Sequence, residues 1–152
     1  MKFAPALLPH LIDAIAYVIE KNAEEVTALD QAIGDGDHVT NLQRGIQALI
    51  PQREELSQLD WAAAWQKIGM TLMSSIGGAS GSLYGTLFIA LSKAAREQSL
   101  DLQSFADVFT KGVEAVKQRG KADAGEKTML DVYIPVADYL RTAAANAVAL
   151  PE

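Results

Sequence analysis

Apolar residues recur at three- and four-residue spacing along most of the chain, which is the period of a helix with one buried face. The first such stripe predicts a helix from about Pro9 to Thr27. Its apolar positions are Leu8, Leu11, Ile12, Ile15, Val18 and Ile19. A second, short helix is predicted to end at Pro51. Its apolar positions are Leu42, Ile46 and Leu49.

Three further stripes follow. Asp60 is suited to cap a third helix, and a glycine-rich break at residues 76–81 separates that helix from a fourth. A fifth helix is expected to end near Gly120. The apolar positions of these three helices are Trp61, Trp65, Ile68 and Leu72, then Leu83, Leu87, Phe88 and Leu91, then Phe105, Val108, Phe109, Val113 and Val116.

A polar stretch at residues 120–127 leads into a sixth apolar run, from Met129 to about Ala145. Pro135 lies inside this run, and a helical proline cannot bond the carbonyl four residues back, which is that of Asp131. The sixth helix is therefore either kinked near Asp131 or begins at Pro135, and we favour the kink.

The pattern contains no convincing strand and no internal repeat. Six helices with short connections predict an all-α, antiparallel bundle or barrel, formed by residues 1–152 as a single domain. The end of the chain, residues 143–152, is apolar, as expected of a segment that continues into another helix or strand. We therefore expect the domain to be incomplete at its C-terminus.

Composition narrows the function. A net charge of −6 argues against nucleic acid as the main partner, because phosphate backbones are bound by clustered Lys and Arg. The chain has no cysteine, which excludes disulfides, thiolate zinc sites and thiol nucleophiles. The first ten residues lack the apolar core of a signal peptide, and no run is long enough to span a membrane. A cytoplasmic location is the simplest expectation.

Acidic residues are concentrated at residues 30–38, where Asp30, Asp35 and Asp37 are followed by His38. Like charges this close repel unless a cation lies between them, and glycines at 34 and 36 allow a tight loop. Mg²⁺ is typically held by a few carboxylates while it also binds substrate phosphates. The segment is thus a candidate metal site, and the alternative is a solvated acidic loop.

Other metal chemistries fit this segment less well. An EF-hand alignment from Asp35 places Val39 at the third ligand position and Thr40 where glycine is required. Zinc is disfavoured because only one histidine is near and cysteine is absent. We expect His38 to pack beside a nucleotide or to donate to a phosphate more readily than to bind a metal directly.

Two glycine-containing segments are candidates for phosphate binding. Residues 77–81 open a helix, and backbone N–H groups at a helix N-terminus suit a phosphate; the alternative is a plain turn in which Gly81 and Gly85 let two helices pack closely. Residues 120–128 nearly spell a P-loop, but Glu126 stands where the lysine belongs and no strand precedes it. That stretch is otherwise a solvated interhelical loop.

Three segments, in order along the chain, together resemble the L subunit of dihydroxyacetone kinase. They are DQAIGDGDHVTNLQRG at residues 30–45, GMTLMSSIGGASGSLYG at residues 69–85 and RGKADAGEKTMLD at residues 119–131. The resemblance implies a barrel of antiparallel helices with a nucleotide, ADP or ATP, at one rim. It also implies that Asp30, Asp35 and Asp37 hold a pair of Mg²⁺ ions that bridge to the phosphates. The positions that match nucleotide contacts of the family are His38, Val39, Thr40, Asn41, Gly78, Ala79, Ser80, Gly120 and Met129.

The same resemblance implies partners. In the family the acceptor dihydroxyacetone is held by a K subunit, and in the phosphotransferase-dependent branch an M subunit rephosphorylates the bound ADP. Phosphoryl transfer depends on positioning and charge neutralisation, so we assign no general base. Two alternatives remain: a nucleotide- or metal-binding regulator that docks another protein such as a transcriptional regulator, or the kinase domain of a related acyl-phosphorylating enzyme.

Two features depart from the family. Val39 stands where glycine is common, and a β-branched residue tolerates positive φ poorly, so we expect an ordinary backbone there. The family also continues with two further helices, making eight, and a glycine-rich segment between them covers the nucleotide. The sequence has no counterpart to these, which predicts a site less well closed against water.

Overall fold

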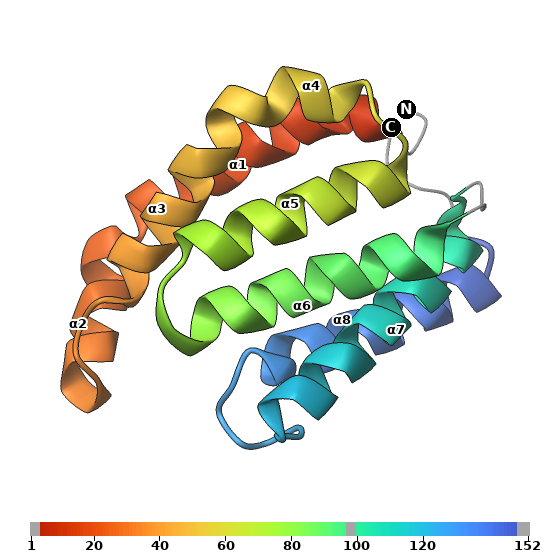
Figure 1. The fold of residues 1–152 in the computed structure, drawn as a ribbon. Coiled ribbons are helices and arrows are strands. Elements are labelled where there is room, and N and C mark those ends of the chain that lie inside the picture. The colour runs from red at the N-terminus through yellow and green to blue at the C-terminus, as the bar shows by residue number, and fades with distance from the viewer. Residues whose placement is uncertain (1–3, 97–99, 149–152) are drawn as a thin grey trace.

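The computed structural model describes residues 4–96 and 100–148, which fold into helices α1 to α8 and two short 3-10 turns. No described residue lies in a strand, in agreement with the all-α prediction. Figure 1 shows α5, α6, α7 and α8 side by side with alternating direction. On the other side of α5 lie α3 and α4, and α1 packs against these two helices. The predicted antiparallel helical arrangement is confirmed. Within the described ranges, no helix is both long enough and apolar enough to cross a membrane.

The N-terminal segment differs from the prediction of one helix over residues 9–27. It forms α1 (Leu8–Lys21) and α2 (Ala23–Ile33), separated at Asn22. The Asn22 side chain donates to the Val18 carbonyl oxygen at 2.7 Å and so satisfies a carbonyl at the end of α1. Because α2 continues to Ile33, Asp30 lies on a helix and not in a loop. Figure 1 shows α2 projecting beyond the other helices.

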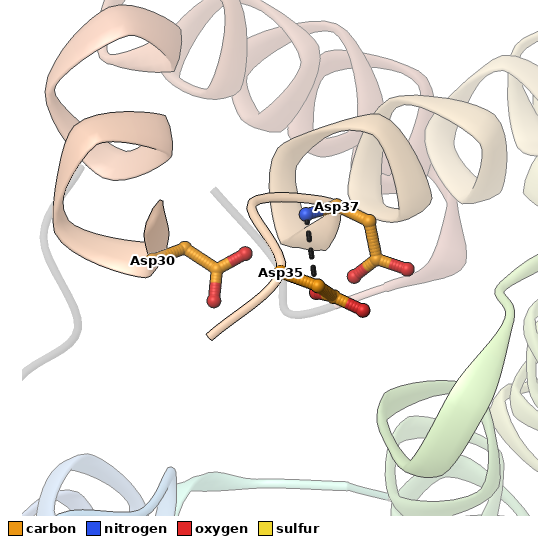
Figure 2. Close-up of side chains that lie close together, drawn as sticks. All are labelled: Asp30, Asp35 and Asp37. Carbon is orange, nitrogen blue, oxygen red and sulfur yellow. Dashed lines mark hydrogen bonds between the residues drawn. The ribbon is translucent and has the colours of Figure 1, made fainter. Parts of the chain in front are cut away.

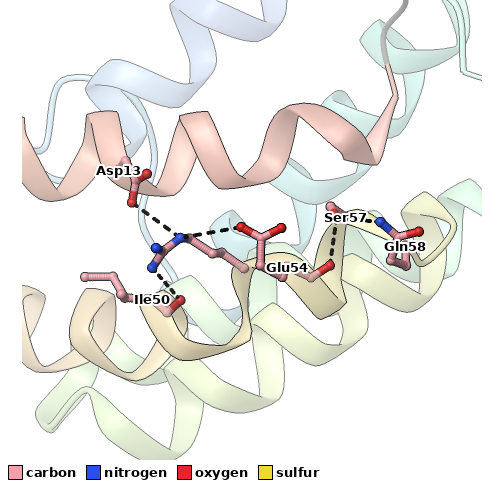
Figure 3. Close-up of polar contacts among 6 residues, drawn as sticks. Asp13, Ile50, Glu54, Ser57 and Gln58 are labelled. Carbon is pink, nitrogen blue, oxygen red and sulfur yellow. Dashed lines mark hydrogen bonds and ion pairs between the residues drawn. The ribbon is translucent and has the colours of Figure 1, made fainter.

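The second predicted helix is α3 (His38–Leu49), and Pro51 follows its end as expected, inside a 3-10 turn (Ile50–Gln52). A short helix that was not predicted, α4 (Arg53–Ser57), comes next. The Arg53 guanidinium donates to the Ile50 carbonyl oxygen at 3.0 Å and lies 3.9 Å from the carboxylates of Asp13 and Glu54 (Figure 3). These contacts tie the α3–α4 junction to α1.

The third helix, α5 (Trp61–Ser75), has the predicted cap, since Asp60 accepts the Ala63 N–H at 2.7 Å. The fourth is α6 (Gly78–Ala95), so the glycine-rich break is shorter than expected. Gly81 and Gly85 are buried in α6, and a Cβ at Gly85 would lie 2.7 Å from the Met73 Cε and 3.2 Å from the Gly69 oxygen. Gly85 therefore lets α5 and α6 pack closely, as the alternative interpretation of this segment expected, whereas a Cβ at Gly81 would meet the Ile76 backbone in the turn between the two helices.

The last two helices are α7 (Leu102–Gly120) and α8 (Leu130–Ala145). α8 begins before Pro135 and includes it, so the alternative in which this helix starts at Pro135 is wrong. The expected continuation past residues 143–152 concerns a segment whose last four residues lie outside the described part of the chain.

The core combines aromatic and aliphatic side chains. Neighbouring rings lie 4.9 to 6.3 Å apart along a series that crosses from α5 through α7 to α8. Its members are Trp61, Trp65, Phe105, Phe109 and Tyr133. Aromatic pairs at this spacing add to the stabilisation from apolar burial.

An apolar cavity of about 390 Å³ lies between α1, α3, α6 and α8. Aliphatic side chains of α1, α3 and the end of α5 line it together with Tyr84, Phe88 and Tyr133. Burial raises the pKa of the Tyr84 and Tyr133 hydroxyls, and the charge that Tyr84 would carry raises that of Tyr133 further. Both phenols are therefore neutral at ordinary pH.

Candidate functional site

The end of α2, the loop after it and the start of α3 bring three carboxylates together. Asp30 lies on the last turn of α2, Asp35 in the loop, and Asp37 at the N-cap of α3. One carboxylate oxygen from each lies within 4.8 Å of the others. Figure 2 shows the three side chains around a common space. Asp30 is half-buried and the other two are exposed, so the cluster is open to a ligand.

Two glycines shape this loop. A Cβ at Gly34 would lie 2.6 Å from the Asp30 Oδ1, so a side chain here would displace that carboxylate. Gly36 has φ +76°, a conformation that residues with a Cβ seldom adopt. The glycines that marked the segment in the sequence thus each meet a specific steric requirement.

The backbone around the cluster orients two of the carboxylates. The His38 N–H donates to the Asp30 Oδ2 at 3.1 Å, so Asp30 caps α3 from the preceding helix. The Asp37 N–H lies 3.4 Å from the Asp35 Oδ1 (Figure 2). Asp37 occupies the N-cap position, yet its side chain makes no capping hydrogen bond. Its carboxylate is directed toward the cluster, where it can serve as a ligand.

These residues fit a hard divalent cation. Mg²⁺ binds oxygen ligands at about 2.0–2.1 Å, so ligands on opposite sides of one ion lie about 4.2 Å apart. The 4.8 Å spread of the carboxylate oxygens requires only a small closure for one ion.

A second helix N-terminus lies beside the first. A Cβ at Gly77, the residue before α6, would be 3.0 Å from the Asn41 Oδ1 and 3.8 Å from the Arg44 Nη1. Arg44 donates to the same Asn41 oxygen at 3.2 Å. The N-termini of α3 and α6 therefore meet, and backbone N–H groups and helix dipoles directed at one region suit a phosphate.

The end of α7 reaches the same region. The Arg119 Nε donates to the Ser82 Oγ at 3.1 Å, and a Cβ at Gly120 would contact the Leu83 Cδ2 at 3.4 Å. The loop after Gly120 is exposed but ordered by a carboxylate, because Asp131 accepts the Gly125 N–H at 2.6 Å and the Lys127 N–H at 2.9 Å. The predicted solvated loop thus has a defined shape.

An ion pair fixes the loop to α7. The Lys117 Nζ lies 2.8 Å from the Asp123 Oδ2. This hydrogen bond raises the pKa of Lys117 and lowers the pKa of Asp123, so both groups remain charged over the physiological range.

The structure gathers most of the sequence-predicted nucleotide positions at one end of the helical layer. His38 and Thr40 lie on the first turn of α3, Asn41 beside Gly77, and Gly78 to Ser80 on the first turn of α6. Val39 differs. It has the ordinary helical backbone that its sequence predicted, but its side chain is 5% exposed, which leaves it little surface for a ligand. Met129 is half-buried and packs against the core.

Sequence reasoning did not select Arg44, Arg119 or Asp131. The two arginines place guanidinium groups near the start of α6, and Asp131 holds the loop in shape. Only the position of Arg44 could have been predicted from the local sequence, because residues three apart on a helix are neighbours and Arg44 follows Asn41 by three. The Arg119–Ser82 contact joins residues 37 positions apart and requires the packed fold.

A family model described as the DAK2 domain matches residues 32–151 of the chain. The chain belongs to the DAK2 domain family. The match includes the loop carboxylates, both helix N-termini and the loop before α8.

Two relatives of this DAK2 domain are named as ADP-binding subunits of dihydroxyacetone kinases. The chain is 43% identical over 122 residues to the ADP-binding subunit DhaL of PEP-dependent dihydroxyacetone kinase 1 from Listeria innocua, covering 80% of this chain and 62% of that protein. It is 38% identical over 135 residues to the corresponding Escherichia coli subunit, covering 88% of this chain and 64% of that protein. The DAK2 domain described here thus spans under two thirds of the length of these relatives.

Solved structures support the fold. The chain superposes on the native dihydroxyacetone kinase of C. freundii with a TM-score of 0.78 and 24% sequence identity, covering 97% of this chain and 27% of that chain. The same kinase in complex with AMP-PNP and Mg²⁺ gives a TM-score of 0.76 at 23% identity. At this identity the likeness establishes the helical architecture.

Proposed function

We propose that this DAK2 domain is the Mg-ADP- or Mg-ATP-binding phosphotransfer subunit of a dihydroxyacetone kinase. The observation that carries the proposal is the cluster of Asp30, Asp35 and Asp37 beside the adjoining N-termini of α3 and α6. Relatives named as ADP-binding subunits of PEP-dependent and PTS-dependent dihydroxyacetone kinases support the nucleotide and the donor system.

Each part of the site has a role in this proposal. The three carboxylates hold a pair of Mg²⁺ ions, which neutralise phosphate charge when bound. Backbone N–H groups of Gly78, Ala79 and Ser80 and of the first turn of α3 donate to phosphate oxygens. Gly120 and Met129 border the remainder of the nucleotide, and no side chain acts as a general base.

Titrating Mg²⁺ with ADP while following thermal unfolding tests whether the chain binds metal and nucleotide, which the kinase proposal and the regulatory alternative both require. A ligand that binds only the folded state stabilises it by about 2.7 kcal/mol at a hundred times its Kd. We expect Asp35→Ala to abolish this ligand-dependent rise in Tm while leaving the helical circular dichroism unchanged. Asp107→Ala, an exposed carboxylate on α7, is the matched control and should retain the full rise. An Asp35→Ala protein stabilised like the unaltered chain would refute the metal assignment.

Activity needs the proposed partners, a K subunit that holds dihydroxyacetone and an M subunit that rephosphorylates the nucleotide. We expect phosphoenolpyruvate-dependent formation of dihydroxyacetone phosphate when all components of the phosphotransferase system are combined. Nucleotide binding without any transfer would favour the regulatory alternative, with docking to another protein such as a transcriptional regulator. A cytoplasmic location belongs to the same proposal.

A further inference from the structure

Helix α2 differs from the other long helices because none of its eleven residues is buried. Leu29 is 64% exposed and Ile33 is 94% exposed. The two residues are four positions apart and so lie on one face. A helix in a globular protein normally buries such an apolar pair, and exposed apolar surface beside a functional site is typical of a contact with another molecule.

The opposite face of α2 accounts for its attachment to the domain. Ala23, Thr27 and Gln31, also at four-residue spacing, line a shallow groove with Val39 and Thr40 of α3. Leu29 and Ile33 are offset from these positions by two residues, or about 200° around the helix. They therefore project away from the domain.

The charge on this part of the molecule is of one sign. Residues 22–43 contain five carboxylates and no Lys or Arg: Glu24, Glu25, Asp30, Asp35 and Asp37. Glu25 precedes Leu29 by four residues and continues the same face. A complementary surface would present an apolar patch bordered by Lys or Arg side chains.

We infer that the outer face of α2, formed by Glu25, Leu29 and Ile33, is the docking surface for the protein that presents the phosphoryl acceptor, which bears an apolar patch with a basic border beside its acceptor site. The inference rests on the proposed function, because it takes the phosphate to be held at Asp30. Ile33 and Asp30 are three residues apart, with Cβ atoms roughly 5–6 Å from each other. A protein that brings an acceptor to a phosphate at Asp30 would therefore come within contact distance of Ile33.

The test is binding of the dihydroxyacetone-holding subunit to this chain in the presence of Mg-ADP, measured by calorimetry. We expect Leu29→Ser and Ile33→Ser each to weaken the complex by roughly tenfold or more, as central apolar anchors do. Glu25→Lys should weaken it too, mainly by slowing association at low salt. Met70→Ser, at a position on α5 that is 61% exposed, is the matched control and should leave the affinity unchanged.

Thermal stabilisation by Mg-ADP is measured on every variant and separates the two claims. If Mg-ADP does not stabilise the unaltered chain, the proposed function is refuted. Full stabilisation together with unchanged subunit affinity in Ile33→Ser overturns the docking inference alone. If the Ile33→Ser protein no longer binds Mg-ADP, the docking inference is also overturned, because the Ile33 side chain would then be needed to support the metal-binding loop. Self-association of the unaltered chain that Ile33→Ser abolishes, with subunit affinity intact, would assign the face to a second copy.

Discussion

At the scale of single residues, the site depends on how close the backbone comes to its own carboxylates. Gly34 is in contact distance of Asp30, and Gly36 has a left-handed backbone. The sequence could predict this part, because Asp30, Asp35 and Asp37 lie within eight positions and the glycines between them restrict the loop to tight conformations. The neighbouring Asn41–Gly77 contact could not be predicted in the same way, since it depends on how α3 packs against α5.

Gly34→Ala tests the steric requirement. The added Cβ would lie 2.6 Å from the Asp30 Oδ1, so we expect the carboxylate to move and the Mg-ADP-dependent rise in Tm to shrink markedly. Unfolding of the protein without ligand should change by less than about 1 kcal/mol, because the loop is exposed.

A double-mutant cycle isolates the cause of that loss. If Gly34→Ala acts through Asp30, it should have no further effect on ligand-dependent stabilisation in an Asp30→Ala background. Additive losses would show that the alanine disturbs the loop independently of Asp30.

At the scale of elements, apolar periodicity predicted the long helices well and their interruptions poorly. The stripe from Leu8 to Ile19 gave no sign that α1 ends at Lys21, because Asn22 acts through a local hydrogen bond to Val18. The extension of α2 to Ile33 was missed for a related reason. Leu29 and Ile33 do not face the core, so burial did not shape the pattern there.

The turn between α5 and α6 is the tightest junction near the site. A Cβ at Gly81 would collide with the backbone oxygen of Ile76, which cannot rotate away as a side chain can. We expect Gly81→Ala to destabilise the domain by about 1–3 kcal/mol, despite the higher helix propensity of alanine. Urea unfolding measures this loss.

Thr86→Ala, later on the same helix, is a suitable control because it adds no atoms. It should change the free energy of unfolding by less than the Gly81 substitution. Equal stability of Gly81→Ala and the unaltered chain would mean that the turn opens without cost.

At the scale of the whole molecule, the helices border a partly open apolar cavity that two phenols also line. The cavity of about 390 Å³ is bordered by Tyr84 and Tyr133, whose pKa values burial raises. Periodicity identified the helices that line it but not the cavity itself, because that depends on how α1 and α8 are spaced across the fold.

These tyrosines make stability fall in alkali. Unfolded tyrosine ionises near pH 10, whereas the folded Tyr133 keeps its proton to higher pH, so the unfolded state loses protons first. The free energy of unfolding should therefore be steady below about pH 10 and fall above it, by up to about 1.4 kcal/mol per pH unit for this group. Urea unfolding at pH 9, 10 and 11 would show the decline.

Tyr133→Phe should reduce the slope above pH 10, since it removes the group that ionises. Tyr17→Phe, at an exposed position on α1, is the control and should leave the slope unchanged. The same slope in all three proteins would mean that Tyr133 is open to solvent.

The lack of buried residues in α2 has a consequence for ligand affinity. A helix without a buried face opens locally at a smaller free-energy cost than the whole domain. Asp30 is correctly placed only while α2 is folded, because it lies on the last turn of that helix. The apparent affinity for metal and nucleotide is thus the intrinsic affinity multiplied by the fraction of molecules in which α2 is formed. A partner that covers Leu29 and Ile33 would raise that fraction, and would tighten nucleotide binding without contacting the nucleotide.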